Sequence, residues 1–74
     1  MKRNKLNTQY FDVHCQFENS GYSIPVMMHG YRKQDEQSIK DHCKNERLFV
    51  EEGDDEFVDN ITEIDKDEYD KMNN

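Results

Sequence analysis

The chain has 74 residues, with 17 Asp and Glu against 10 Lys and Arg, so its formal net charge is −7. This length allows one small domain at most, residues 1–74, and excludes a multidomain enzyme or a large cofactor site. Eleven of the acids lie between residues 51 and 70, where Lys66 is the only cation. Such an acidic field repels the phosphates of nucleic acids and of anionic lipids, so neither direct nucleic-acid binding nor membrane binding is expected.

Residues 1–8 are predicted to be flexible, and residues 10–29 are predicted to form a β-hairpin. Phe11 and Val13 begin an alternation of apolar and polar residues with the period of two that is typical of a half-buried strand. A turn rich in Asn, Ser and Gly follows, and a second alternating run comes after it. Pro25 in this second run lacks an N–H group, so the second strand should be an edge strand or contain a bulge.

A helix is predicted over residues 36–46. Asp35 is a good N-cap, because its carboxylate can accept a hydrogen bond from an N–H group of the first turn. Ile39 and Cys43 lie four residues apart and form a narrow apolar stripe that can face the sheet.

The last third of the chain begins with an acidic segment. Five acids surround Gly53 in residues 51–56, and a loop is predicted there because carboxylates are not expected to be buried. Residues 57–64 fit either a helix or a strand, and a strand is favoured because they are rich in Val, Ile and Thr. Asp65 begins a capping box, which predicts a helical turn over residues 66–72. The fold class is therefore α+β, with a small antiparallel sheet, an N-terminal hairpin, one main helix packed on the sheet and a short C-terminal helical turn.

Neither metal binding nor catalysis has a clear signature. Cys15 and Cys43 are interpreted as buried free thiols in a reducing cytoplasm, and a zinc site assembled from Cys15, His29 and Cys43 is the weaker alternative. No neighbouring residues have the geometry of a thiolate–imidazole pair, and no glycine pattern for phosphate binding is present. No apolar run has the length of a membrane span or a signal peptide. We therefore expect a cytoplasmic protein that is not an enzyme and has no cofactor.

The acids themselves are the candidate site. Carboxylates spaced about 6–7 Å apart along a strand or a helix can approach the charge density of a DNA backbone. Asp59, Glu63, Asp65 and Asp67 are predicted to share one strand face. Apolar residues such as Phe57 interrupt the acids at intervals that a disordered tail does not need. A solvated acidic face with no binding role is the alternative. The predicted partner-binding residues are Glu51, Glu52, Asp54, Asp55, Glu56, Asp59, Glu63, Asp65, Asp67, Glu68 and Asp70.

Three features of the chain resemble a known type of protein. They are the acidic run from Glu51 to Asp70, the small size, and a composition that is rich in Asn and Lys and contains no Ala. In these features it resembles the small acidic proteins that phages make to disable host functions. Several of those proteins are DNA mimics, such as inhibitors of uracil-DNA glycosylase or of nucleoid-associated proteins. The resemblance implies host takeover: an inhibitor in the host cytoplasm that binds a basic, nucleic-acid-binding host protein, with carboxylates in the place of DNA phosphates.

A second hypothesis assigns the interaction to the edge of the hairpin. Residues 22–29 would expose Ser23, Met27 and His29 on an edge strand, and sheet edges are natural docking templates. The chain would then be a structural or regulatory interaction module, and its partner at this edge could be a second copy of the chain in a homodimer.

Overall fold

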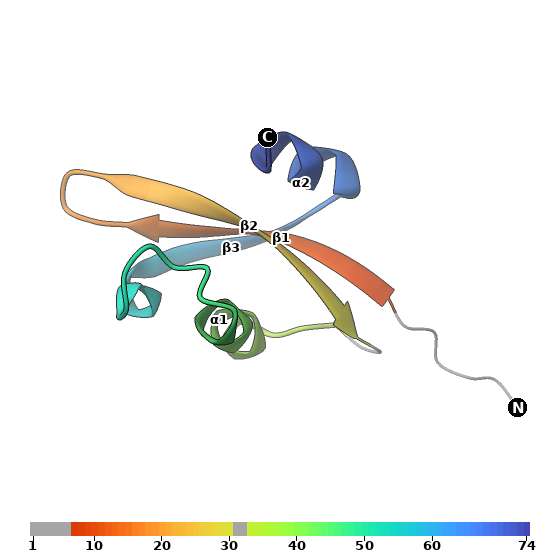
Figure 1. The fold of residues 1–74 in the computed structure, drawn as a ribbon, viewed down its shortest axis with the longest axis horizontal. Helices are drawn as coiled ribbons and strands as arrows, with labels where there is room; N and C mark the ends of the chain where they lie inside the picture. The colour runs from red at the N-terminus through yellow and green to blue at the C-terminus, as the bar shows by residue number, and fades with distance from the viewer. Residues whose placement is uncertain (1–6, 31–32) are drawn as a thin grey trace, which may run out of the picture.

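Three antiparallel strands and two helices form the fold in the computed structural model, which describes residues 7–30 and 33–74 (Figure 1). The elements are β1 (Asn7–Gln16), β2 (Gly21–Gly30), α1 (Glu36–Asn45), the 3₁₀ helix η1 (Asp54–Phe57), β3 (Val58–Ile64) and α2 (Lys66–Met72). The strand order is β2-β1-β3. The α+β fold class predicted from the sequence is confirmed.

The hairpin of β1 and β2 forms as its alternation predicts. Phe11 lies opposite Val26, and Val13 lies opposite Ile24, so these four side chains share one face of the sheet. All four are buried there. Pro25 lies in β2, which is an edge strand, as its missing N–H group requires.

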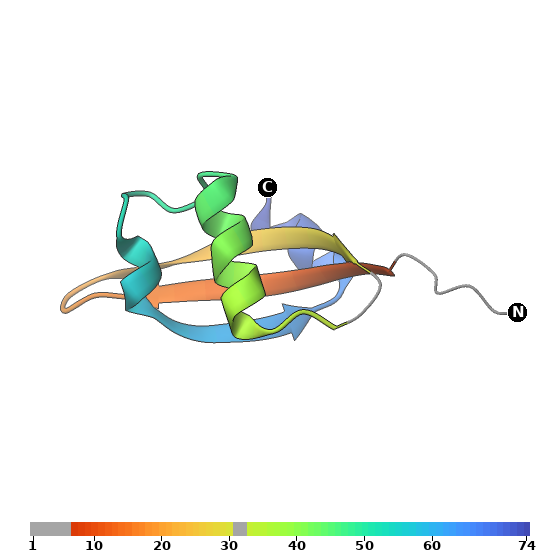
Figure 2. The same ribbon diagram turned by 90° about the horizontal axis from the view of Figure 1, so that it is seen from below.

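Helix α1 crosses the sheet on the face that carries the buried side chains (Figure 2). The Asp35 carboxylate accepts a hydrogen bond of 2.8 Å from the Ser38 N–H, which caps the helix and lowers the pKa of Asp35. Ile39 and Cys43 are the buried residues of the helix, and they pack into the core formed by the hairpin. Arg47 has φ +55°, a left-handed conformation that turns the chain away after the helix.

Helix α2 lies on the opposite face of the sheet from α1 (Figure 1). Its N-cap is Asp65, whose carboxylate accepts a hydrogen bond of 2.8 Å from the Glu68 N–H. The Tyr69 ring packs against Tyr10 of β1 with a centroid separation of 5.1 Å. This aromatic contact holds the C-terminal helix on the sheet, although none of its residues is fully buried.

An irregularity in the pairing of β1 with β3 decides which β3 side chains face the core. Val13 lies opposite Ile61 and Cys15 lies opposite Val58, with a register shift after His14. Val58 and Ile61 are three residues apart, yet both pack against the core. The prediction that Asp59 and Glu63 share one face of this strand is therefore wrong, because the bulge adds one residue and reverses the side-chain direction beyond it.

The predicted flexibility of residues 1–8 falls mostly on residues 1–6, which lie outside the described residues. Asn7 and Thr8 are the first residues of β1. Among the residues that the structure describes, no helix is long and apolar enough to span a lipid bilayer.

Candidate functional site

The acidic loop, residues 51–56, contains one buried carboxylate. Asp54 is only 7% exposed, and its Oδ2 accepts hydrogen bonds from the Tyr22 hydroxyl at 2.6 Å and from the Glu51 N–H at 3.1 Å. The prediction that every acid of this loop is exposed is therefore wrong for Asp54. Burial of this carboxylate is tolerated because two donors satisfy the same oxygen.

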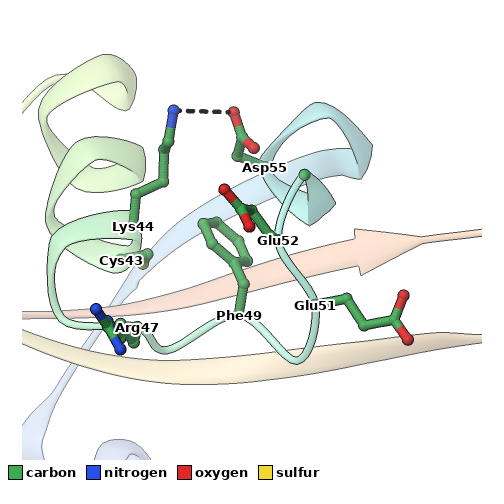
Figure 3. A pocket seen from close by; sticks show the side chains of 8 residues that line it. Cys43, Lys44, Arg47, Phe49, Glu51, Glu52 and Asp55 are labelled. Atoms are coloured by element: carbon green, nitrogen blue, oxygen red, sulfur yellow. Dashed lines mark ion pairs between the residues drawn. The ribbon is translucent and has the colours of Figure 1, made fainter.

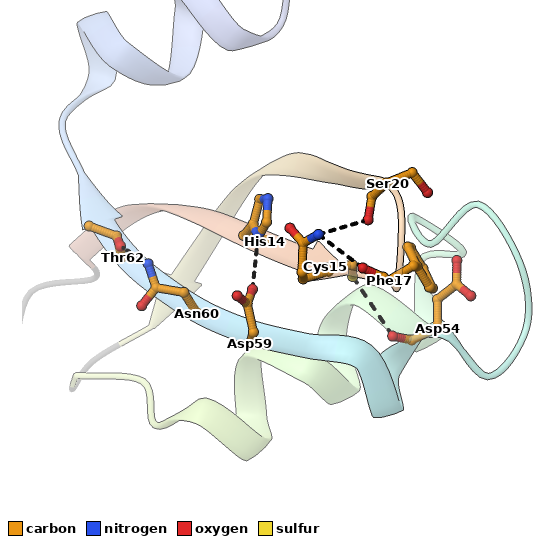
Figure 4. A network of polar contacts seen from close by, with 9 residues as sticks. His14, Cys15, Phe17, Ser20, Asp54, Asp59, Asn60 and Thr62 are labelled. Atoms are coloured by element: carbon orange, nitrogen blue, oxygen red, sulfur yellow. Dashed lines mark hydrogen bonds and ion pairs between the residues drawn. The ribbon is translucent and has the colours of Figure 1, made fainter.

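Further bonds join this carboxylate to the hairpin and to the chain before the loop. The Tyr22 hydroxyl accepts a hydrogen bond of 3.2 Å from the Val50 N–H, and the Cys15 thiol donates to the Asp54 carbonyl at 3.7 Å (Figure 4). Burial raises the pKa of Tyr22, and its bond to Asp54 raises it further. Burial also raises the pKa of Cys15. Both groups therefore stay protonated at neutral pH, which keeps both donors in place and fixes the loop against the hairpin.

The remaining acids of the loop differ in their partners. Asp55 is half-buried and lies 3.8 Å from Lys44 of α1 in an ion pair. Glu51, Glu52 and Glu56 are exposed and form no ion pair with any residue in the described ranges. These three carboxylates are therefore the part of the loop that can bind a cationic partner.

Exposed apolar residues flank these carboxylates along the chain, because Val50 precedes Glu51 and Phe57 follows Glu56. The Phe17 ring packs against Phe57 with a centroid separation of 4.8 Å and against Tyr22 at 5.9 Å. Phe57 is nevertheless 46% exposed, and Val50 is 73% exposed. Together, Glu51, Glu52, Glu56, Val50 and Phe57 form what we call the loop surface. Apolar anchors ringed by charge are typical of protein-binding sites.

A cavity of about 450 Å³ lies between the C-terminal end of α1 and the acidic loop, and the ring of Phe49 forms part of its lining (Figure 3). Lys44 and Arg47 line it on the helix side, whereas Glu52 and Asp55 line it on the loop side. Charges of both signs thus face one another across the cavity. Lys44 and Arg47 thus offset part of the charge of Glu52 and Asp55, whereas Glu56 does not line this cavity.

The thiols and the imidazoles do not come together. Cys15 and Cys43 are free and buried on the face covered by α1, and burial together with the neighbouring Cys15 raises the pKa of Cys43 to about 11. His29 lies on the other face, where its Nδ1 is 3.0 Å from the Thr8 hydroxyl. The alternative of a zinc site built from Cys15, His29 and Cys43 is therefore wrong. Among residues 7–30 and 33–74, no three His, Cys, Asp or Glu side chains lie close enough together to hold a metal ion.

The acids of β3 and the cap of α2 do not form the predicted single face. Asp59 lies 2.7 Å from Nδ1 of His14, and this contact joins β3 to β1 at the bulge (Figure 4). Glu63 lies opposite Phe11 and so belongs to the α1 face. Asp65 caps α2. The bulge and the helix cap separate these side chains, which the strand alternation alone would have aligned.

The acids of α2 form a second group. Asp67 and Glu68 are exposed in the first turn of the helix, where its positive dipole end favours them. Asp70 pairs with Lys66 at 2.8 Å, and this bond raises the pKa of Lys66. Helix α2 and the acidic loop lie on opposite sides of the sheet, so the predicted site residues separate into a loop group and an α2 group, with Asp59 and Glu63 on β3 between them (Figure 1).

Comparison of the chain with protein-family models, with curated proteins and with solved structures finds no match. The site therefore rests on the physical features of this chain alone. Sequence reasoning identified the exposed glutamates and Phe57 but missed Val50, Phe17 and Tyr22. One signal was present for Tyr22, because a tyrosine on the buried face of a strand needs a partner for its hydroxyl.

Proposed function

We propose that this protein is an acidic inhibitor that binds a basic partner protein through the loop surface and blocks the partner's nucleic-acid-binding site. The single observation that supports this most is that three exposed glutamates without ion partners in the described part of the chain occur in one short segment, which exposed Val50 precedes and exposed Phe57 follows. In this proposal the glutamates take the place of DNA phosphates and pair with Lys and Arg of the partner.

Charge and apolar contact have different roles in such a complex. Long-range attraction between the acidic C-terminal third and a basic surface raises the association rate, which makes binding sensitive to salt. Burial of an aromatic side chain such as Phe57 slows dissociation. The network around Asp54 fixes the loop before binding, so less conformational entropy is lost when the complex forms.

A pair of charge-matched variants tests the proposal. The site variant carries Glu51→Lys, Glu52→Lys and Glu56→Lys. The control variant carries Glu18→Lys, Glu36→Lys and Glu46→Lys, which change the net charge by the same amount at exposed positions outside the loop surface. Asp54 is left unchanged because it is buried and hydrogen-bonded, so its substitution would test folding instead of binding.

Each protein is immobilised and incubated with a bacterial lysate, and the captured proteins are then eluted either with salt or with an excess of short duplex DNA. We expect the native chain and the control variant to retain basic nucleic-acid-binding proteins that both salt and DNA release. The site variant should retain none of them. Captured proteins that duplex DNA fails to displace, or equal capture by the site variant, would contradict the proposal.

Interaction through the edge of the hairpin is a second candidate function. It is favoured by the position of β2 at the edge of the sheet and by the exposure of Ser23, Met27 and His29 on it. This candidate predicts a dimer that persists in high salt. Sedimentation of the native chain at two salt concentrations distinguishes it from the charge-driven complex.

A further inference from the structure

We propose that the outer edge of β3 accepts an extended segment of the basic partner as a fourth strand of the sheet. This inference rests on the proposed function, because it identifies how that partner is held and which part of it binds. Within the described part of the chain, no strand pairs with this edge, since the order is β2-β1-β3. Edges of this kind are templates for strand addition.

The hydrogen-bond pattern of the hairpin shows which backbone groups of β1 point toward β2. The Phe17 N–H donates to the Ser20 carbonyl at 2.7 Å, so this pair at the end of the hairpin is of the hydrogen-bonded type. Such pairs alternate along an antiparallel ladder. The pair of Asp12 with Pro25 is then of the non-hydrogen-bonded type, which agrees with the missing N–H group of proline.

The same alternation identifies the free groups of β3. Asp12 directs its backbone groups away from β2 and toward Thr62, its partner in β3. The residues on either side of Thr62, namely Ile61 and Glu63, therefore direct their N–H and C=O groups outward. These two residues present two donors and two acceptors with a spacing of about 6.6–6.8 Å, which matches the repeat of an incoming strand.

The two edges of the sheet differ in how well they are protected. The outer edge of β2 contains Pro25, which removes a donor near the middle of the strand. Strand β3 contains neither Pro, Gly nor Lys, and no Lys or Arg occurs anywhere from Val50 to Asp65. The edge of β3 is thus the better template for an added strand.

The side chains of β3 indicate the chemistry of that added strand. Ile61 is half-buried on the α1 face, and Glu63 is exposed on the same face two residues later. An added strand with an aliphatic residue opposite Ile61 and a Lys or Arg opposite Glu63 would bury apolar surface and form a cross-strand ion pair. The carboxylates of the edge also repel a second copy of this acidic chain, which favours a basic occupant.

A designed peptide tests the inference without knowledge of the natural partner. The peptide Thr-Lys-Thr-Val-Thr-Lys-Thr, blocked at both ends, places Lys, Val and Lys on one strand face in either direction. Hydrogen exchange of the backbone amides is measured by NMR on the full chain. At a peptide concentration ten times the Kd, we expect exchange at Ile61 and Glu63 to slow about tenfold. The analogous peptide with Glu in place of Lys should give no protection.

Two substitutions at one position separate the backbone from the charge. Glu63→Gln keeps the outward N–H and should weaken peptide binding by about threefold, as expected for an exposed ion pair. Glu63→Pro removes the N–H as well and should weaken binding at least tenfold further, while circular dichroism reports a folded chain. Equal affinities of the two variants would overturn the inference.

Three other outcomes would also overturn it. The first is that the peptide slows amide exchange at Ser23 and Met27 and not in β3, and the second is that the acidic peptide slows exchange equally. The third is slow exchange at Ile61 and Glu63 in the free protein at high concentration, which would show that a second copy occupies the edge. None of these outcomes affects the proposed function, which fails if the site variant retains its partners or if duplex DNA does not displace them. The two hypotheses can therefore fail separately.

Discussion

Removal of the Tyr22 hydroxyl should destabilise the protein even though it leaves every exposed acid in place. In Tyr22→Phe, Oδ2 of the buried Asp54 loses the shorter of its two bonds, the 2.6 Å contact with the hydroxyl. Hydrogen bonds to charged groups contribute about 1.5–3 kcal/mol. The Val50 N–H also loses its partner, but water can replace it because Val50 is 73% exposed. We therefore expect the free energy of unfolding to fall by about 2 kcal/mol.

This loss is large for so small a protein. Typical stabilities of about 0.05–0.15 kcal/mol per residue give a chain of this length about 4–11 kcal/mol in total. Urea unfolding followed by circular dichroism measures the difference. Tyr10→Phe is the matched control, because the Tyr10 ring packs against Tyr69 and forms no hydrogen bond through its hydroxyl among the described residues. We expect the control to change the free energy of unfolding by less than about 0.5 kcal/mol.

A double-mutant cycle identifies the origin of the effect. If the loss comes from the bond to Asp54, Tyr22→Phe should cost little in an Asp54→Ala background, with a coupling free energy of about 1–2 kcal/mol. Tyr22→Phe should also weaken partner binding, because it loosens the loop that carries the exposed glutamates. A loss in stability below about 0.5 kcal/mol, or no coupling with Asp54, would refute the role assigned to this network.

Two further predictions concern the core and the loop. Burial raises the pKa of Cys43 from 9.0 to about 11, so the folded state holds this proton more tightly than the unfolded state. The contribution of this thiol to the free energy of unfolding should be fully present below pH 9. It should fall by at most about 2.7 kcal/mol as the pH rises from 9 to 11, which urea unfolding at a series of pH values measures. A Cys43→Ala variant should show a smaller fall, and an equal fall would contradict this assignment. Gly53 has φ +95°, and no atom lies within 4 Å of the position that a Cβ would occupy. Gly53→Ala should therefore lower the free energy of unfolding by about 1–2 kcal/mol, from backbone strain alone. Gly53→Asn, which tolerates this conformation better, should cost less, and equal costs would contradict that cause.

The hairpin and α1 could be predicted from the sequence because their signals are local. Alternation around Val13 marks the half-buried strand, and Pro25 identifies the edge. The carboxylate of Asp35 accepts its capping hydrogen bond from the N–H group of Ser38, only three residues later. In each case the residues that cause the structure are neighbours along the chain, so the sequence shows them together.

The bulge and the buried carboxylate depend on contacts between distant segments. The register shift after His14 exists only in the pairing of β1 with β3, and nothing near Asp59 in the sequence marks it. Asp54 is buried because Tyr22, thirty-two residues earlier, supplies a hydroxyl. The composition of this region predicts a solvated acidic loop. Only the folded structure shows that one of its acids stabilises the position of the others.

Binding through the loop surface requires a fixed conformation of the acidic loop, and nuclear relaxation of the backbone amides from Glu51 to Glu56 tests this requirement most directly. We expect order parameters of about 0.85, the value of a rigid backbone and close to those of β1 and α1. Order parameters below about 0.6 across these six residues would contradict binding through the loop surface, because a mobile segment could not present the three glutamates together with Phe57 as one surface.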